Sequence, residues 1–227
     1  MIVITYLFVD FVEMWYNFVM NYKTIKRDNI TEEDIKKSRF ICHLKRVTTE
    51  DDARQFINSI KKEHYKANHS CSAMIIGDNS EIKRSSDDGE PSGTAGVPML
   101  TVLEKQELTN VVAVVTRYFG GIKLGAGGLI RTYAGSVANA LSQTGIVSVK
   151  EQAGLRLTLT YPQYQIYANF LAQEKLVECN TQFLDNITTD IYTDPDAVKS
   201  VEEALIDFYQ GKVTYHAIDS TIIEVPV

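Results

Sequence analysis

The chain contains few of the residues that usually build disulfide, metal or redox sites. It has 3 cysteines, 4 histidines and 1 tryptophan among 227 residues, and no Cys-x-x-Cys pair. An odd number of scattered cysteines is typical of reduced thiols in a cytoplasmic protein and argues against a zinc site. Repeats and low-complexity tracts are also lacking. Because the chain exceeds the usual length of one domain and is 44% hydrophobic, we expect two domains with real cores.

The common nucleotide-binding motifs are absent as well. A P-loop requires Gly-x-x-x-x-Gly-Lys, but Gly120 and Gly125 are followed by Ala126. A dinucleotide-binding fingerprint requires Gly-x-Gly-x-x-Gly, but the sixth position counted from Gly125 is Ile130. The sequence therefore excludes these two kinds of glycine-rich nucleotide site here.

A glycine-rich turn is the most distinctive feature that is present. Residues 117–135 hold 6 of the 13 glycines. They follow the apolar run Val111–Val115, which is typical of a buried strand, and precede apolar residues with helical spacing from Leu129 onward. The glycines are thus predicted to lie on a turn between a strand and a helix.

This turn has the chemistry of an anion site. Glycine lets another group approach the backbone, and a helix N-terminus offers unpaired N–H groups to an anion. The predicted anion- or nucleic-acid-binding residues are Arg117, Lys123, Arg131, Gly120, Gly121, Gly125, Gly127 and Gly128. The alternative is a tightly packed turn whose glycines serve packing alone.

A second loop, residues 84–98, carries three carboxylates. It contains too many turn formers for a regular element. Asp87, Asp88 and Glu90 could gather a hard cation, although the spacing of a calcium loop is absent. A salt bridge from at least one of them to Arg117 or Arg131 is the favoured interpretation.

Three segments in this region resemble the YigZ/Impact family. They are Asn68–Cys71, Ser86–Leu100 and Thr116–Gly125, and the resemblance runs in order over roughly residues 22–145. It implies an α+β chain with two domains. Residues 20–150 would form an Impact-type domain with the ribosomal protein S5 domain 2-like fold. Residues 151–227 would form a ferredoxin-like domain similar to the last domain of elongation factor G.

The resemblance also implies a role in translation, because eukaryotic relatives regulate translation initiation through the activator of a starvation-responsive kinase. We expect a binding or regulatory protein that contacts RNA, the ribosome or a translation factor. We expect no DNA sequence specificity, membrane, cofactor, metal or catalytic residue. The alternative is a small-molecule or phosphate-handling enzyme that uses the glycine turn, which rests on fold analogy alone.

His69 and Cys71 are two residues apart on a predicted strand, so their side chains share a face. A nucleophilic pair is conceivable, but a buried cysteine and a hydrogen-bonded histidine are the favoured interpretation. His69, Asp87, Asp88 and Glu90 are therefore predicted as a possible polar site, with Arg117 beside them.

Charge is divided unevenly along the chain. Residues 20–150 contain 19 Lys and Arg against 15 Asp and Glu, whereas residues 151–227 contain 4 against 12. The acidic second domain would repel a phosphate backbone, so nucleic-acid contact is expected from the first domain only.

Residues 1–19 are apolar and aromatic but form a poor signal peptide, because they lack a basic beginning and a cleavage site. Asp10 and Glu13 also make a membrane span costly. Since proteins that this chain resembles begin near Met20, we expect an over-extended start and Met20 as the native initiator.

Periodicity predicts the remaining elements. Phe40, Cys42 and Leu44 should share one face of a strand over 38–47, and Thr49 should begin a helix. Further strands are predicted over 69–77, 111–118 and 144–151, with helices over 99–105 and 128–143. The rest follows the β-α-β-β-α-β order of the split βαβ motif, with strands at 155–160, 176–184, 187–193 and 217–225 and helices at 162–172 and 194–209.

Overall fold

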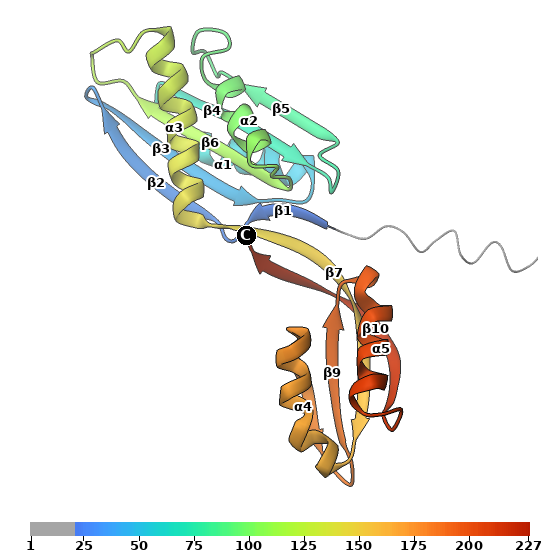
Figure 1. The fold of residues 1–227 in the computed structure, drawn as a ribbon. Helices are drawn as coiled ribbons and strands as arrows, with labels where there is room; N and C mark the ends of the chain where they lie inside the picture. Colours follow the sequence, from blue (N-terminus) through green and yellow to red (C-terminus); the bar gives the residue numbers. More distant parts are fainter. Residues whose placement is uncertain (1–20) are drawn as a thin grey trace, which may run out of the picture. The chain divides into compact units, whose positions relative to one another are not determined.

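The computed structural model describes residues 21–227 (Figure 1). The expectations for residues 1–19 and for an initiator at Met20 lie outside this range. The described chain divides into two compact units. The first comprises residues 21–149 together with 224–227, and the second comprises residues 150–223. Both units are mixed α and β, as predicted.

The first unit is built on a five-stranded antiparallel sheet with the order β2-β3-β6-β4-β5. Its central strand, β6, is buried along nearly its whole length because helices cover both faces of the sheet. This explains the continuous apolar run in β6. The strands are β2 (Asn29–Ile35), β3 (Ser38–Arg46), β4 (His69–Ile76), β5 (Ile82–Ser86) and β6 (Val111–Tyr118).

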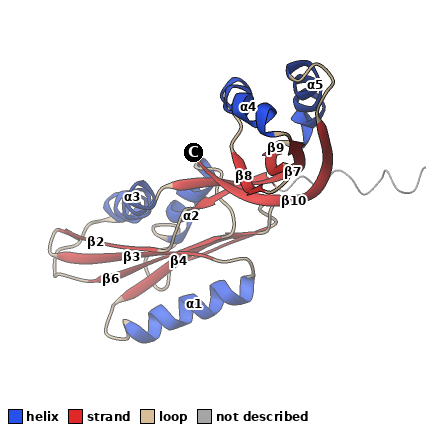
Figure 2. Ribbon diagram, turned by 90° about the horizontal axis from the view of Figure 1, so that it is seen from below, coloured by secondary structure: helices blue, strands red, loops and turns tan. Residues whose placement is uncertain are grey.

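Three helices cover this sheet. Helix α1 (Glu50–Glu63) lies on one face, and α2 (Gly96–Lys105) and α3 (Ala126–Thr144) lie on the other (Figure 2). Thr49 caps α1 as predicted, because its side chain accepts a hydrogen bond from the Asp52 amide. The predicted strand face is also confirmed: Phe40, Cys42 and Leu44 belong to the core under α2 and α3.

The second unit follows the predicted β-α-β-β-α-β order. Strand β10 pairs with β7, and the sheet continues through β9 to β8, which is the strand order of a ferredoxin-like fold. Its core lies between the sheet and the two helices, around Leu157, Phe170 and Leu205. The elements are β7 (Ile146–Leu159), α4 (Tyr161–Glu174), β8 (Glu178–Phe183), β9 (Ile187–Thr193), a 3₁₀ turn (Pro195–Ala197), α5 (Val198–Phe208) and β10 (Thr214–Pro226). The first residues of β7 and the last residues of β10 belong to the first unit.

Three strands were not predicted from the sequence: β1 (Asn21–Ile25), β2 and β5. Strands β2 and β5 are the two edges of the first sheet and carry many exposed polar residues, so they lack an apolar run. Strand β5 and the first residues of α2 lie partly in the segment 84–98, for which no regular element was expected.

Among residues 21–227 no helix is long and apolar enough to cross a membrane.

Candidate functional site

Asp87 fixes the acidic loop in front of α2. Its Oδ1 accepts hydrogen bonds from the amides of Ala95 and Gly96 at 3.0 and 2.8 Å, and its Oδ2 accepts one from Gly93 at 2.8 Å. Burial opposes ionisation of this carboxyl, but the three N–H groups outweigh it and hold the pKa of Asp87 below its ordinary value. Asp87 therefore holds the loop and the start of α2 together.

Asp88 ties the same loop to strand β4 and helix α1. Its Oδ2 accepts from the amide of Ser70 at 2.6 Å, and its Oδ1 accepts from Nζ of Lys61 at 2.5 Å. Its main-chain carbonyl lies 2.9 Å from Nδ1 of His69. Because Asp87 and Asp88 are each held by protein donors, the structure does not bring them together as ligands for one cation.

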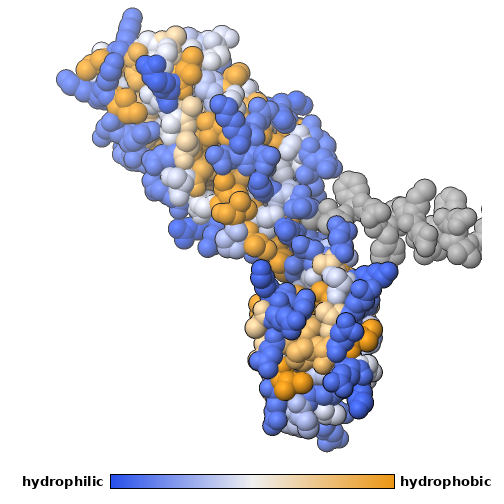
Figure 3. All heavy atoms as spheres, in the orientation of Figure 1, coloured by the Kyte–Doolittle hydropathy of each residue, from blue (hydrophilic) through white to orange (hydrophobic). Residues whose placement is uncertain are grey.

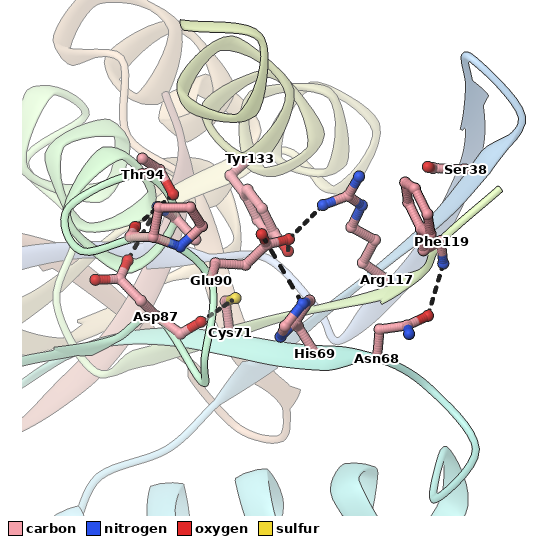
Figure 4. A network of polar contacts seen from close by, with 12 residues as sticks. Ser38, Asn68, His69, Cys71, Asp87, Glu90, Thr94, Arg117, Phe119 and Tyr133 are labelled. Atoms are coloured by element: carbon pink, nitrogen blue, oxygen red, sulfur yellow. Dashed lines mark hydrogen bonds and ion pairs between the residues drawn. The ribbon is translucent and has the colours of Figure 1, made fainter. Parts of the chain in front are cut away.

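Glu90 is the centre of a buried polar network (Figure 4). Its Oε1 accepts from Nη1 of Arg117 at 2.6 Å and from the Tyr133 hydroxyl at 2.8 Å. Nε2 of His69 lies 3.9 Å from its Oε2. The predicted salt bridge between the acidic loop and Arg117 is therefore confirmed, and Glu90 rather than Asp87 or Asp88 makes it.

His69 is a hydrogen-bonded histidine and Cys71 is a buried cysteine, as favoured by the sequence. The Cys71 thiol is fully buried and donates to the main-chain oxygen of Asp87 at 2.9 Å. Burial raises the pKa of Cys71 to about 12, so the thiolate is disfavoured at neutral pH. The interpretation as a hydrogen-bonded histidine beside a buried cysteine is confirmed, and this pair offers no activated nucleophile.

The glycine turn joins β6 to α3, and its glycines have two roles: close packing and a left-handed backbone conformation. At Gly120 a Cβ atom would lie 1.7 Å from the main-chain oxygen of Lys37, so only glycine allows the turn to pack against the β2–β3 turn. Gly121 and Gly125 have φ values of +86° and +74°, and nothing lies within 4 Å of a Cβ built on either. These two glycines permit the backbone conformation and leave open space beside it.

The cations at this turn differ from the predicted set. Arg117 does not reach the turn, because its guanidinium is buried against Glu90 and packs over the rings of Phe40 and Phe119 at 5.4 Å from each centroid. Lys123 and Arg131 are exposed, as an anion site requires.

Two further lysines, Lys36 and Lys37, stand at the β2–β3 turn beside Gly120 and are also exposed. Both have left-handed φ values, 48° and 66°, as expected for a tight hairpin turn. Sequence reasoning missed them because strand β2 was not recognised. The available signal was the adjacent pair Lys36 and Lys37 just before the predicted strand over 38–47.

A groove of about 320 Å³ lies between β2 and α3 at this end of the first unit. Lys36, Leu124, Gly128 and Arg131 line it, and so does Glu33, which is hydrogen-bonded to Ser136. Lys36, Lys37, Lys123 and Arg131 form no ion pair within residues 21–227; we call these four residues the basic rim. Figure 3 shows hydrophilic and hydrophobic side chains intermingled over this end of the unit.

The comparisons with known proteins cover nearly the whole described chain. The family model for the Impact N-terminal domain matches residues 36–141, and the model for a domain of unknown function, DUF1949, matches residues 157–212. The IMPACT family member YvyE of Bacillus subtilis is 43% identical over 204 residues, which are 90% of this chain and 94% of that protein.

An IMPACT family member of Haemophilus influenzae is 34% identical over 205 residues, covering 89% of this chain and 96% of the relative. Among solved structures, the crystal structure of a hypothetical protein is 33% identical, with a TM-score of 0.56, and covers 88% of this chain and 98% of that one.

Proposed function

Because the chain belongs to the IMPACT family, we propose that it is a translation-associated binding protein and that its basic rim contacts the phosphate backbone of RNA. The resemblance of the first domain to regulators of translation initiation supports the role in translation. The observation that carries the RNA contact is the basic rim, four exposed cations without ion pairs within residues 21–227, placed around an open glycine turn and a groove.

The local geometry favours a phosphate over a neutral ligand. Helix α3 begins at Ala126, and its cap residue Gly125 has no side chain to occupy the first amides. Unpaired N–H groups and the helix dipole favour negative charge at this end. Arg131 adds a planar donor that can bind two phosphate oxygens at once, and the lysines add point charges.

Exposed apolar side chains beside the basic rim favour unpaired bases over a regular duplex. Phe119 is 45% exposed, and Ile122 and Ile130 are each 42% exposed. Bases that are free of a duplex stack on aromatic side chains, while cations follow the backbone. The surface therefore suits single-stranded or looped RNA, free or as part of the ribosome.

The enzyme alternative lacks a comparable observation among the described residues. Glu90, Tyr133 and Arg117 are buried and joined by hydrogen bonds through Glu90, and Glu33 in the groove is hydrogen-bonded to Ser136. The Glu90 network stabilises the fold around the turn, whereas the exposed charged groups there include the cations of the basic rim.

Titration of a short unstructured RNA onto the full chain at several salt concentrations tests the proposal. Replacing Lys123 and Arg131 together with alanine should weaken binding and lower the salt slope by about 1.4, since each single-strand phosphate contact contributes about 0.7. A matched control replaces Lys199 and Lys212, which lie in the acidic second unit and should change binding little.

Circular dichroism melts of both double variants establish that each is folded. A folded Lys123→Ala/Arg131→Ala variant with wild-type affinity and salt slope would remove the basic rim as the RNA contact. Equal losses in the two double variants would indicate a general charge effect and would also contradict the proposal.

A further inference from the structure

A cluster of possible metal ligands lies on the face of the first sheet that α1 covers, opposite to helix α3. His43 is on β3, and Glu63 and His64 are at the C-terminal end of α1. One ligand atom from each residue can be chosen so that all three lie within 4.8 Å of one another. None of the three belongs to the basic rim or to the Glu90 network.

His43 is buried, and its Nδ1 has no hydrogen-bonding partner. Its side chain faces α1, because its neighbours Cys42 and Leu44 on β3 point into the core under α2 and α3. The residue is 4% exposed, and Nδ1 has no partner. A buried polar atom left unpaired is costly, so a buried imidazole nitrogen in this state is an unusual feature.

His64 also has a buried nitrogen without a hydrogen-bonding partner, and it lies beside Glu63. Its Nδ1 lies 3.0 Å from the Tyr118 hydroxyl, whereas Nε2 is buried and has no hydrogen-bonding partner. The His43 and His64 ring centroids are 5.3 Å apart, and Nε2 of His64 lies 3.9 Å from Oε1 of Glu63. Two histidines therefore present unsatisfied nitrogens beside one carboxylate.

We infer that His43, Glu63 and His64 form a binding site for a divalent transition-metal ion of the zinc type. Two imidazoles and one carboxylate are a common three-ligand set for such ions, with water in the remaining position. Tetrahedral ligands at about 2.0 Å from zinc are about 3.3 Å apart, so side-chain closure from the present spacing of up to 4.8 Å would complete the site.

Tyr118 contacts one of the three residues, and a groove leads to two of them. Donation by Nδ1–H of His64 to the Tyr118 oxygen would leave the lone pair on Nε2, which is the usual orientation of a ligating histidine. A groove of about 620 Å³ is lined by His43 and Glu63 and also by Asp28 and Lys45. It gives a hydrated ion access to His43 and Glu63, and Lys45 is the one cation that lines it.

Titration of the chelator-treated full chain with Co²⁺ and Zn²⁺ tests this inference. Co²⁺ should give the visible bands of a four-coordinate nitrogen and oxygen site, and one equivalent of Zn²⁺ should abolish them. Glu63→Gln changes an exposed side chain and should weaken binding at least about tenfold while the fold persists. His64→Gln should weaken it further, and Tyr118→Phe should weaken it less than either ligand change.

His216→Gln is the matched control, because it removes an exposed histidine of the second unit and should leave Co²⁺ affinity unchanged. A sulfur-to-cobalt charge-transfer band would assign binding to a cysteine and overturn the inference. So would unchanged affinity in a folded Glu63→Gln/His64→Gln variant, or no saturable binding by the wild-type chain. The outcome is independent of the RNA-binding proposal, since no basic-rim residue is changed.

Discussion

Arg117 and Glu90 form an ion pair inside the first unit: Nη1 and Oε1 lie 2.6 Å apart, and the two side chains are only 6% and 4% exposed. The pair links the acidic loop before α2 to the strand that precedes the glycine turn. A buried pair of this kind adds little net stability over an apolar replacement, but either partner alone is costly. Its place in the fold makes it a structural support for the turn.

The Glu90→Gln variant should lose about 3–5 kcal/mol of unfolding free energy, because it leaves the Arg117 charge buried and unpaired. Urea denaturation measures this loss. Tyr133→Phe removes one hydrogen bond to the same oxygen and should cost less, about 1.5–3 kcal/mol. If Glu90→Gln were no more destabilising than Tyr133→Phe, the ion pair would not hold the loop as described.

Asp87 should contribute to stability in a pH-dependent way. Because its pKa is depressed in the folded state, its contribution is fully present above the ordinary aspartate pKa of about 3.9. The contribution is lost as the pH falls through the lower, folded-state pKa. Asp87→Asn should therefore cost about 2 kcal/mol at pH 7 and much less at pH 2 to 3.

Urea unfolding of the wild type and Asp87→Asn at a series of pH values gives this difference directly. Asp185→Asn provides the control, because Asp185 is exposed in the turn between β8 and β9 and forms no ion pair within residues 21–227. An Asp87→Asn penalty that stayed constant down to pH 2 would show that the charge of Asp87 plays no part.

Two glycines of the turn should respond oppositely to alanine. Gly120→Ala places a Cβ 1.7 Å from a main-chain oxygen and should destabilise the fold by at least about 2 kcal/mol. Gly127 lies inside the first turn of α3 with the nearest atom 3.6 Å away, so Gly127→Ala should stabilise by about 0.5–1 kcal/mol. Thermal melts compare the two. Similar effects at both positions would contradict the described packing.

The two units should fold separately after a cut following Lys150. The core residues of the first unit lie between Ile25 and Leu141, and those of the second lie between Leu155 and Tyr209, so the cut leaves each core whole. Residues 20–150 and 151–227 should each melt cooperatively by circular dichroism. A fragment without a cooperative transition would show that its core depends on the other part of the chain.

The sequence predicted elements where one physical signal dominated. Thr49 predicted the start of helix α1, and the apolar run predicted strand β6. The alternation of Phe40, Cys42 and Leu44 predicted which face of β3 is buried in the core under α2 and α3. Edge strands β2 and β5 were missed because their residues are mostly polar and their pairing comes from distant partners. Helix α2 began earlier than expected because Asp87 holds its first amides.

The candidate site was predicted only in part for a related reason. The sequence places the glycines, Lys123 and Arg131 at one turn because they are close in the chain. Lys36 and Lys37 reach the same place only through the pairing of β2 with β3. The direction of the Arg117 side chain depends on Glu90, 27 residues away, and local spacing cannot specify such a contact.

The assignment of residues 224–227 to the first unit has a consequence for the order of synthesis. Residues 224–227 belong to the first unit, where the Val227 amide donates to the Ile146 oxygen at 3.1 Å and Glu224 pairs with Arg46 at 2.5 Å. A ribosome makes these residues after the entire acidic unit. The first unit therefore emerges early, but its hydrogen bond to Ile146 and its ion pair between Arg46 and Glu224 form only after the second unit has been translated.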